Sequence, residues 1–180
     1  MVRSPLSVVS CPLLYSFACC GIIYSVAWQG GPLARGERGP STFPPRKTRR
    51  DFQIVAEIRA REARVLANNG NEEGAYYLGG IAIECALKAC IAKKTKRHDF
   101  PPRDANKLYI HDLGQLLKLA ELDTRLDKAM KRNRALNANW GVVQNWKFES
   151  RYETSGLKGS DLVAAVNSAD GVLQWIRRRW

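Results

Sequence analysis

Hydrophobic residues follow a helical spacing along most of the chain after residue 50, and no strand-like alternation competes with it. The first helix is predicted to begin after Asp51 and to end near residues 68–70, where two asparagines and a glycine favour a helix end. Its opposite face carries charged residues, as in an amphipathic helix. Its inward positions are predicted to be Phe52, Val55, Ile58, Val65 and Leu66.

The second predicted helix differs from the first because it is apolar around most of its circumference. Asn71 can cap it, and Glu72 and Glu73 in its first turn suit the helix dipole. The stretch AYYLGGIAIECALKACIAKK, residues 75–94, forms its body, and a double proline at residues 101–102 forbids its continuation. A helix of this composition is normally buried on several sides.

Further helices are predicted from capping signals and apolar spacing. Asp112 with Gln115 indicates the start of a short third helix. Thr124 is expected to cap a fourth helix with a kink at residues 137–141, and Ser160 to cap a last one. The chain is therefore predicted to be all-α, an up-and-down bundle of four to five helices with short connections. The inward positions of these later helices are Leu113, Leu116, Leu117, Ala120, Leu126, Met130, Leu136, Trp140, Leu162, Val163, Val166, Val172, Leu173 and Ile176.

The first fifty residues differ in kind from residues 51–180. Residues 5–28 contain no charged side chain, and the stretch after them, rich in Gly, Pro and Arg, predicts a disordered linker. The apolar segment is long enough to cross a bilayer, and it is also similar to a signal peptide with a weak cleavage site. As an anchor it would leave the helical domain on the cytoplasmic side. A third interpretation is that translation starts further in, so that this segment is not native and the protein is cytoplasmic.

The formal net charge of +12 is high, and residues 51–180 contribute half of it. A positive field on the folded part suits an anionic partner such as RNA, DNA or a nucleotide. The basic tracts KKTKRH, residues 93–98, and RRRW, residues 177–180, are either contacts to phosphate groups or solvated helix ends. The five cysteines form no C-x-x-C pattern and the two histidines lie far from them, so neither a metal nor another cofactor is predicted.

Two charged residues stand in the middle of the apolar second helix. Glu84 precedes Lys88 by four residues, which is the favourable order for an ion pair within a helix. One interpretation is a salt bridge at the rim of the bundle or at a dimer interface, because Gly79 and Gly80 leave room for another helix. The other is a functional site, which requires a second polar group from elsewhere, and Arg151 before the last helix is the candidate.

The stretches YYLGGIAIECALKACIAK, HDLGQLLKLA and NWGVVQNWKFESRY, followed by a final helix, resemble the HEPN domain family over essentially all of residues 51–180. The resemblance implies a bundle of four or five helices that often forms dimers, here through the second helix. Many family members are ribonucleases, frequently the toxin of a prokaryotic toxin–antitoxin pair whose partner is a small nucleotidyltransferase. Others are non-catalytic modules that bind nucleic acids or nucleotides, so RNA or a nucleotide is the implied ligand.

The family's ribonuclease motif is an Arg, four to six residues and a His at the start of the last helix, often with a Glu-x3-Lys on the second helix. Glu84 and Lys88 match the second part, and Arg151 stands where the arginine is expected. No histidine occurs in residues 152–158, so the motif is incomplete. His111 can reach the site only from the start of the third helix, where a histidine ordinarily has a capping or loop role.

The missing histidine matters because cleavage of RNA through its 2′-hydroxyl needs a group that titrates near neutral pH as well as a cation. Arg151 and Lys88 supply cations, but arginine stays protonated and Tyr152 titrates near 10. The sequence therefore predicts a non-catalytic module that binds an anion near Glu84, Lys88, Arg151 and Tyr152. One alternative is an active ribonuclease toxin with an altered motif, in which Arg151 and His111 act. Another is a structural dimerisation partner of a nucleotidyltransferase.

Overall fold

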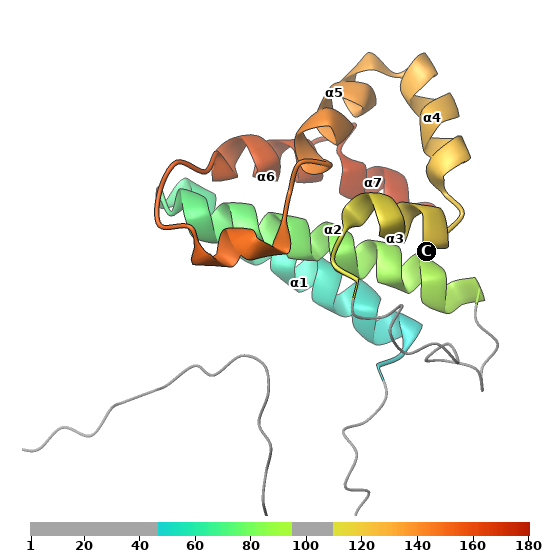
Figure 1. Cartoon of the computed structure of the whole chain (residues 1–180), viewed down its shortest axis with the longest axis horizontal. Coiled ribbons are helices and arrows are strands. Elements are labelled where there is room, and N and C mark those ends of the chain that lie inside the picture. The colour runs from blue at the N-terminus through green and yellow to red at the C-terminus, as the bar shows by residue number, and fades with distance from the viewer. Residues whose placement is uncertain (1–46, 95–109) are drawn as a thin grey trace, which may run out of the picture. The chain divides into compact units, whose positions relative to one another are not determined.

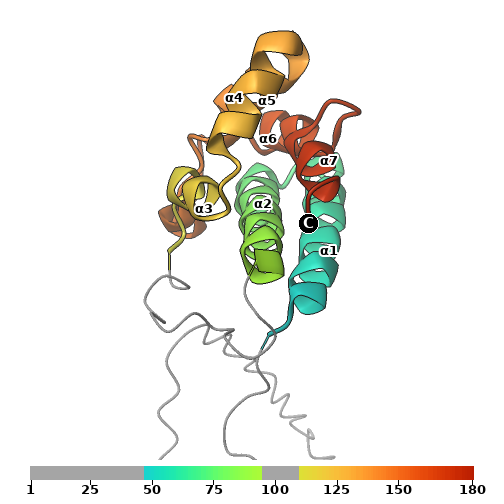
Figure 2. The same cartoon turned by 90° about the vertical axis from the view of Figure 1, so that its right-hand side faces the viewer.

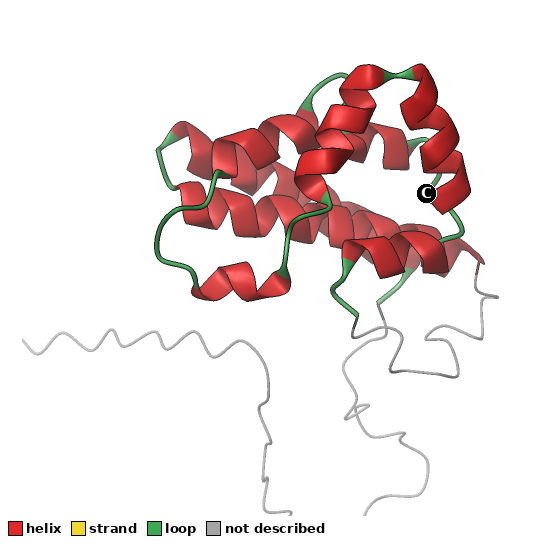
Figure 3. Ribbon diagram, turned by 45° about the horizontal axis from the view of Figure 1, so that its top comes forward, coloured by secondary structure: helices red, strands yellow, loops and turns green. Residues whose placement is uncertain are grey.

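Helices make up the part of the chain that this computed structural model describes, residues 47–94 and 110–180, and no strand occurs there (Figure 3). These residues belong to one compact unit, Phe43–Trp180, and they confirm the predicted all-α bundle. The elements are α1 (Arg49–Asn68), α2 (Glu72–Lys94), α3 (Leu113–Leu119), α4 (Asp123–Arg132), α5 (Arg134–Val143), the 3₁₀ helix η2 (Phe148–Tyr152), α6 (Gly159–Asn167) and α7 (Val172–Arg177). The apolar segment at residues 5–28, residues 29–46 of the linker, the double proline and residues 95–98 of the basic tract lie outside the described residues. Arg49 and Arg50, at the end of the predicted disordered linker, are instead the first residues of α1.

Helices α1 and α2 form an antiparallel pair joined by a tight turn (Figure 1). Helix α1 begins before the predicted position, because the Thr48 hydroxyl accepts a hydrogen bond from the Asp51 amide at 3.2 Å while the Asp51 carboxylate accepts one from the Thr48 amide at 2.7 Å. This capping box satisfies two backbone donors at the helix start. The turn uses a positive φ of 74° at Gly70, which glycine adopts at low cost, and α2 then begins at Glu72 as predicted.

The face of α1 that is buried against the bundle is made of small residues. Ala56, Ala60 and Ala63 are almost completely buried, whereas Val65, which was predicted to point inward, is 60% exposed. Alanine side chains let two helix backbones approach closely, so they occupy the contact with α2. The larger apolar residues of α1 lie at the edges of that contact or on the surface.

Helix α2 is the centre of the bundle, since it contacts α1, α3, η2, α6 and α7 (Figure 2 shows it between α1 and α3). Its residues 82–90 are buried without interruption, which confirms the expectation of a helix covered on several sides. Among the described helices it is also the one that is long and apolar enough to cross a membrane. In this fold 67% of its most apolar stretch is buried inside the bundle.

The two glycines of α2 make room for side chains of the same chain. A Cβ atom at Gly79 would lie 3.2 Å from Leu162 of α6, and one at Gly80 would overlap the indole of Trp146. The close approach that the glycines were expected to allow is therefore made within the monomer. A dimer through α2 would have to use a different part of its surface.

The fourth predicted helix is two helices, and its boundaries differ from the prediction. The break falls at Asn133, whose side-chain oxygen accepts a hydrogen bond from the Leu136 amide at 3.0 Å and so caps α5. The predicted kink at residues 137–141 is wrong, because these residues lie inside α5. The predicted cap at Thr124 is also wrong, since α4 begins at Asp123 and no side chain caps it.

The last predicted helix is likewise divided, into α6 and α7, at residues 168–171. Gly171 packs so tightly against the Val166 carbonyl that a side chain would not fit there. Ser160 does not cap α6; its amide donates to the Glu72 carboxylate at 2.7 Å, and its hydroxyl donates to the same carboxylate. These bonds join the start of α6 to the start of α2.

Replacing Gly80 with alanine is expected to destabilise the protein, because the added methyl group overlaps the Trp146 indole. Overpacking of this kind costs about 1–3 kcal/mol, which denaturation in urea followed by circular dichroism would measure. The control is Gly141→Ala in α5, where no atom lies within 4 Å of the added carbon. That change should stabilise the helix by about 0.5–1 kcal/mol, and equal effects at the two positions would contradict the packing described.

Acid should weaken the contact between α2 and α6. Hydrogen bonds from the side chain and then the backbone of Ser160 lower the pKa of Glu72. A carboxyl group whose pKa is lower in the folded state stabilises the protein above its unfolded pKa, and that stability is lost as the pH falls through the folded value. We therefore expect Glu72→Gln to reduce the fall in Tm between pH 6 and pH 3. Glu73→Gln is the control, and an identical pH dependence in both variants would refute this role of Glu72.

Candidate functional site

Glu84 lies in the buried middle of α2, and both of its carboxylate oxygens have cationic or polar partners. Its Oε1 accepts a hydrogen bond from Lys88 Nζ at 2.7 Å, and its Oε2 lies 2.9 Å from His111 Nδ1. Glu84 is 5% exposed and Lys88 is 7% exposed. The predicted ion pair is therefore present and buried, and the carboxylate is paired as burial of a charge requires.

His111 reaches Glu84 because of the way in which α3 begins. It directly precedes Asp112, whose side-chain oxygen accepts a hydrogen bond from the Gln115 amide at 2.7 Å and caps α3 as predicted. The contact with a carboxylate means that His111 Nδ1 carries the proton and donates it, which leaves Nε2 as the nitrogen available for chemistry. The His111 side chain is 35% exposed, and within the described ranges Nε2 has no hydrogen-bond partner.

Phe148, the first residue of η2, joins His111 to Arg151. Its ring stacks on the His111 imidazole with a centroid distance of 3.8 Å and an interplanar angle of 11°. The Arg151 guanidinium carbon lies 4.0 Å from the same ring centre, and two groups this close must occupy opposite faces of the ring. In a 3₁₀ helix the side chains at positions i and i+3 lie above one another, which explains why η2 presents Phe148 and Arg151 together.

Arg151 and Tyr152 form the exposed edge of the site. Arg151 Nη2 donates to the Tyr152 hydroxyl at 2.7 Å, and the guanidinium carbon lies 4.5 Å from the Tyr152 ring centre. Tyr152 is 70% exposed. Across residues 47–94 and 110–180, no carboxylate forms an ion pair with Arg151. The guanidinium is therefore held by two aromatic rings while its charge remains uncompensated.

The structure brings the predicted site residues Glu84, Lys88, His111 and Arg151 into one continuous set of contacts, with Tyr152 at its outer edge. Lys88 was predicted to lie where an anion binds. Its amine is instead buried and faces Glu84. His111 precedes a cap, as a loop histidine would, and also contacts the site.

Phe148 is the residue that the sequence reasoning missed. It stands three positions before Arg151, in a stretch for which no helix was predicted. Recognition of FESRY as helical would have placed the two side chains on one face. The aromatic ring is what separates the imidazole from the guanidinium, so it sets the geometry of the site.

Metal binding and thiol chemistry would each need particular side chains among the described residues of this region. The described residues contain no group of three or more His, Cys, Asp or Glu side chains that could hold a metal ion. Cys85 and Cys90 are free and buried, and burial raises the pKa of each thiol to about 11. Such thiols stay protonated at neutral pH and are poor nucleophiles.

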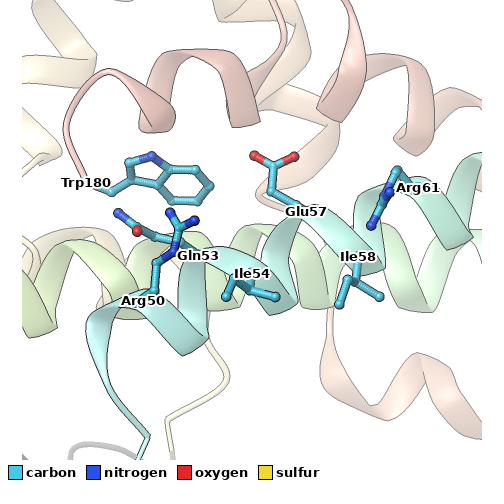
Figure 4. Close-up of a pocket in the computed structure, with 7 residues that line it drawn as sticks. All are labelled: Arg50, Gln53, Ile54, Glu57, Ile58, Arg61 and Trp180. Carbon is cyan, nitrogen blue, oxygen red and sulfur yellow. The ribbon is translucent and has the colours of Figure 1, made fainter.

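A separate cleft of about 330 Å³ lies between α1 and the C-terminal residue, and Figure 4 shows the side chains around it. None of the predicted site residues lines it. The acidic side chain in its lining, Glu57, accepts hydrogen bonds from Arg177, including one of 2.6 Å from Nε, so this charge is already paired. The lining residues are Arg50, Gln53, Ile54, Glu57, Ile58, Arg61 and Trp180.

Replacing Glu84 with glutamine should cost about 3–5 kcal/mol of folding stability, because Lys88 is left buried without a counter-charge. The double variant Glu84→Leu/Lys88→Met should recover most of this loss, since it removes both charges. The control is Glu62→Gln, which breaks a surface pair with Arg59 and should cost less than about 1 kcal/mol. Urea denaturation would measure all three, and a Glu84 variant as stable as the Glu62 variant would show that the buried pair is not needed.

The site combines an exposed cation, an exposed aromatic ring and a histidine oriented by a carboxylate. Such a set of groups can bind an anion, and the histidine can also accept or donate a proton. Comparisons with protein-family models, with curated proteins and with solved structures find no match for this chain. Its activity therefore has to be inferred from the chemistry of the site.

Proposed function

We propose that this protein is a HEPN-like module that binds RNA or a nucleotide at the surface formed by His111, Arg151 and Tyr152. The observation that carries the proposal is the guanidinium of Arg151, which lies between two aromatic rings at the protein surface and has no carboxylate partner within residues 47–94 and 110–180. The sequence resemblance over residues 51–180 and their positive charge support the same ligand class. RNA also agrees with the cytoplasmic location that the sequence predicts.

Each exposed group of this surface has a partner in a nucleotide. The guanidinium of Arg151 can donate two parallel hydrogen bonds to a phosphate group. The exposed ring of Tyr152 can stack on a base, which contributes about 1–3 kcal/mol per base. His111 adds a second cation beside the phosphate whenever its imidazole is protonated. Lys88 contributes indirectly, because it compensates the charge of Glu84 and keeps that carboxylate from opposing an anionic ligand at close range.

A ribonuclease is the second candidate function, and the contact between Glu84 and His111 favours it. His111 Nε2 would take the proton of a 2′-hydroxyl while Glu84 holds the proton on Nδ1. The 2′-oxygen would then attack the phosphorus, the bond to the 5′-oxygen would break, and His111 Nε2 would pass the proton that it took up to the departing 5′-oxygen, which leaves as a hydroxyl group. Arg151 would stabilise the charge that develops on the phosphorane. Against this, the Phe148 ring separates the imidazole from the guanidinium, so we rank binding first.

The resemblance also makes a small nucleotidyltransferase, in a toxin–antitoxin pair, a partner that we propose for either function. A purely structural role as a dimerisation partner has less support, because Leu162 and Trp146 already fill the space beside the α2 glycines.

The test is fluorescence anisotropy of a labelled single-stranded RNA of 20 nucleotides with the full-length chain. Arg151→Ala should weaken binding by about tenfold or more, because a charge-assisted hydrogen bond contributes about 1.5–3 kcal/mol. Tyr152→Ala should have an effect of similar size through lost stacking. Arg64→Ala, an exposed arginine on α1, is the control and should bind like the wild type.

Wild-type affinity in the Arg151 variant would refute the proposed binding surface. The same samples, separated on a gel, decide between binding and catalysis. Cleavage that yields 2′,3′-cyclic phosphate ends and disappears in both Arg151→Ala and His111→Ala would establish the ribonuclease instead.

A further inference from the structure

Basic side chains from three separate parts of the sequence meet at the end of α2. Lys93 in the last turn of α2 donates a hydrogen bond from Nζ to the Arg179 carbonyl at 3.0 Å. The Arg179 guanidinium carbon lies 3.6 Å from the ring centre of Trp175, and its Nη1 donates to the Trp175 carbonyl. These contacts fix the residues that follow α7 against the end of α2 (Figure 1).

Arg125 of α4 and Arg178 complete this group, which we call the basic end: Lys93, Arg125, Arg178 and Arg179. The pKa of Arg179 is lowered first by partial burial and then by the positive charges of Arg178 and Arg125. Arg179 therefore lies close enough to the other two arginines for their charges to act on its guanidinium. Throughout the described residues, none of the three forms an ion pair with a carboxylate.

Helix dipoles favour the positions of only some of these basic side chains. Lys93 lies in the last turn of α2, where a cation is favoured. Arg125 lies in the first turn of α4, where the dipole disfavours a positive charge, and its side chain is exposed. Like charges gathered without a counter-ion reduce the stability of the folded state. A polyanionic partner would remove that repulsion.

We propose that the basic end is a second contact for RNA, which binds the phosphate backbone of a strand held at the His111–Arg151–Tyr152 surface. The inference rests on the proposed function, and it adds that the ligand is an RNA strand long enough to reach both contacts. Glu84 and Lys93 are nine residues apart on α2, which corresponds to about 14 Å along the helix axis. A mononucleotide is too short to reach both contacts, so the proposed ligand is a strand of several nucleotides.

The test is the salt dependence of binding, measured by anisotropy with the full-length chain and the 20-nucleotide RNA from 50 to 250 mM KCl. The variant Arg125→Gln/Arg178→Gln removes two charges that make no ion pair in the described part of the chain. Its slope of log K against log salt should be smaller by about 1.4, because each lost phosphate contact on a single strand removes about 0.7. Affinity at 50 mM should fall by roughly tenfold.

The matched control is Arg61→Gln/Arg64→Gln, which removes the same charge from exposed positions on α1. Equal slopes in the two double variants would overturn the inference, provided that circular dichroism shows both to be folded.

The Arg151→Ala variant separates this inference from the proposed function. If it binds like the wild type while the basic-end variant loses affinity, the proposed site fails and the basic end alone contacts RNA. If Arg151→Ala loses affinity and the basic-end variant behaves like its control, the site stands and the second contact does not. A wild-type chain that binds no RNA would refute both.

Discussion

The buried carboxylate of Glu84 is the constraint on which the rest of this structure depends. It stands in the middle of the most buried helix, where an unpaired charge would cost several kcal/mol. Lys88 compensates one oxygen from within α2, and His111 contacts the other from the segment before α3. That second contact holds the start of α3 against α2. Because Phe148 stacks on the same imidazole, the position of η2 follows from it as well.

This chain of contacts separates the residues that stabilise the fold from those that can meet a ligand. Glu84 and Lys88 are inside, and their charges largely cancel. Arg151 and Tyr152 are exposed, and two aromatic rings hold the guanidinium in place, with no carboxylate paired to it among the described residues. The surface is therefore preorganised yet still cationic, which is the combination that recognition of a phosphate group requires. The basic end of α2 extends the same positive character along the central helix.

The parts of the fold that could be predicted from the sequence are those in which one segment contains all the information. The composition of residues 75–94 indicated a buried helix, and the spacing of Glu84 and Lys88 indicated an ion pair. The capping of α3 by Asp112 also depends on residues of a single segment. One of the wrong predictions, the cap at Ser160, involves a residue with two competing partners. Ser160 could cap α6, but its amide and hydroxyl donate to the Glu72 carboxylate instead. A single capping hydrogen bond contributes about 1 kcal/mol, which is too little to outweigh these two bonds to Glu72.

The sequence by itself determined the helical class, the central position of α2 and the pairing of its two charges, because each depends on spacing within one helix. Tertiary structure alone decided that His111, 27 residues away, meets Glu84, and that Phe148 lies between His111 and Arg151. It also decided that Arg125 approaches Arg179. Contacts of this kind depend on the packing of separate helices, and no periodicity along the chain encodes which faces will meet.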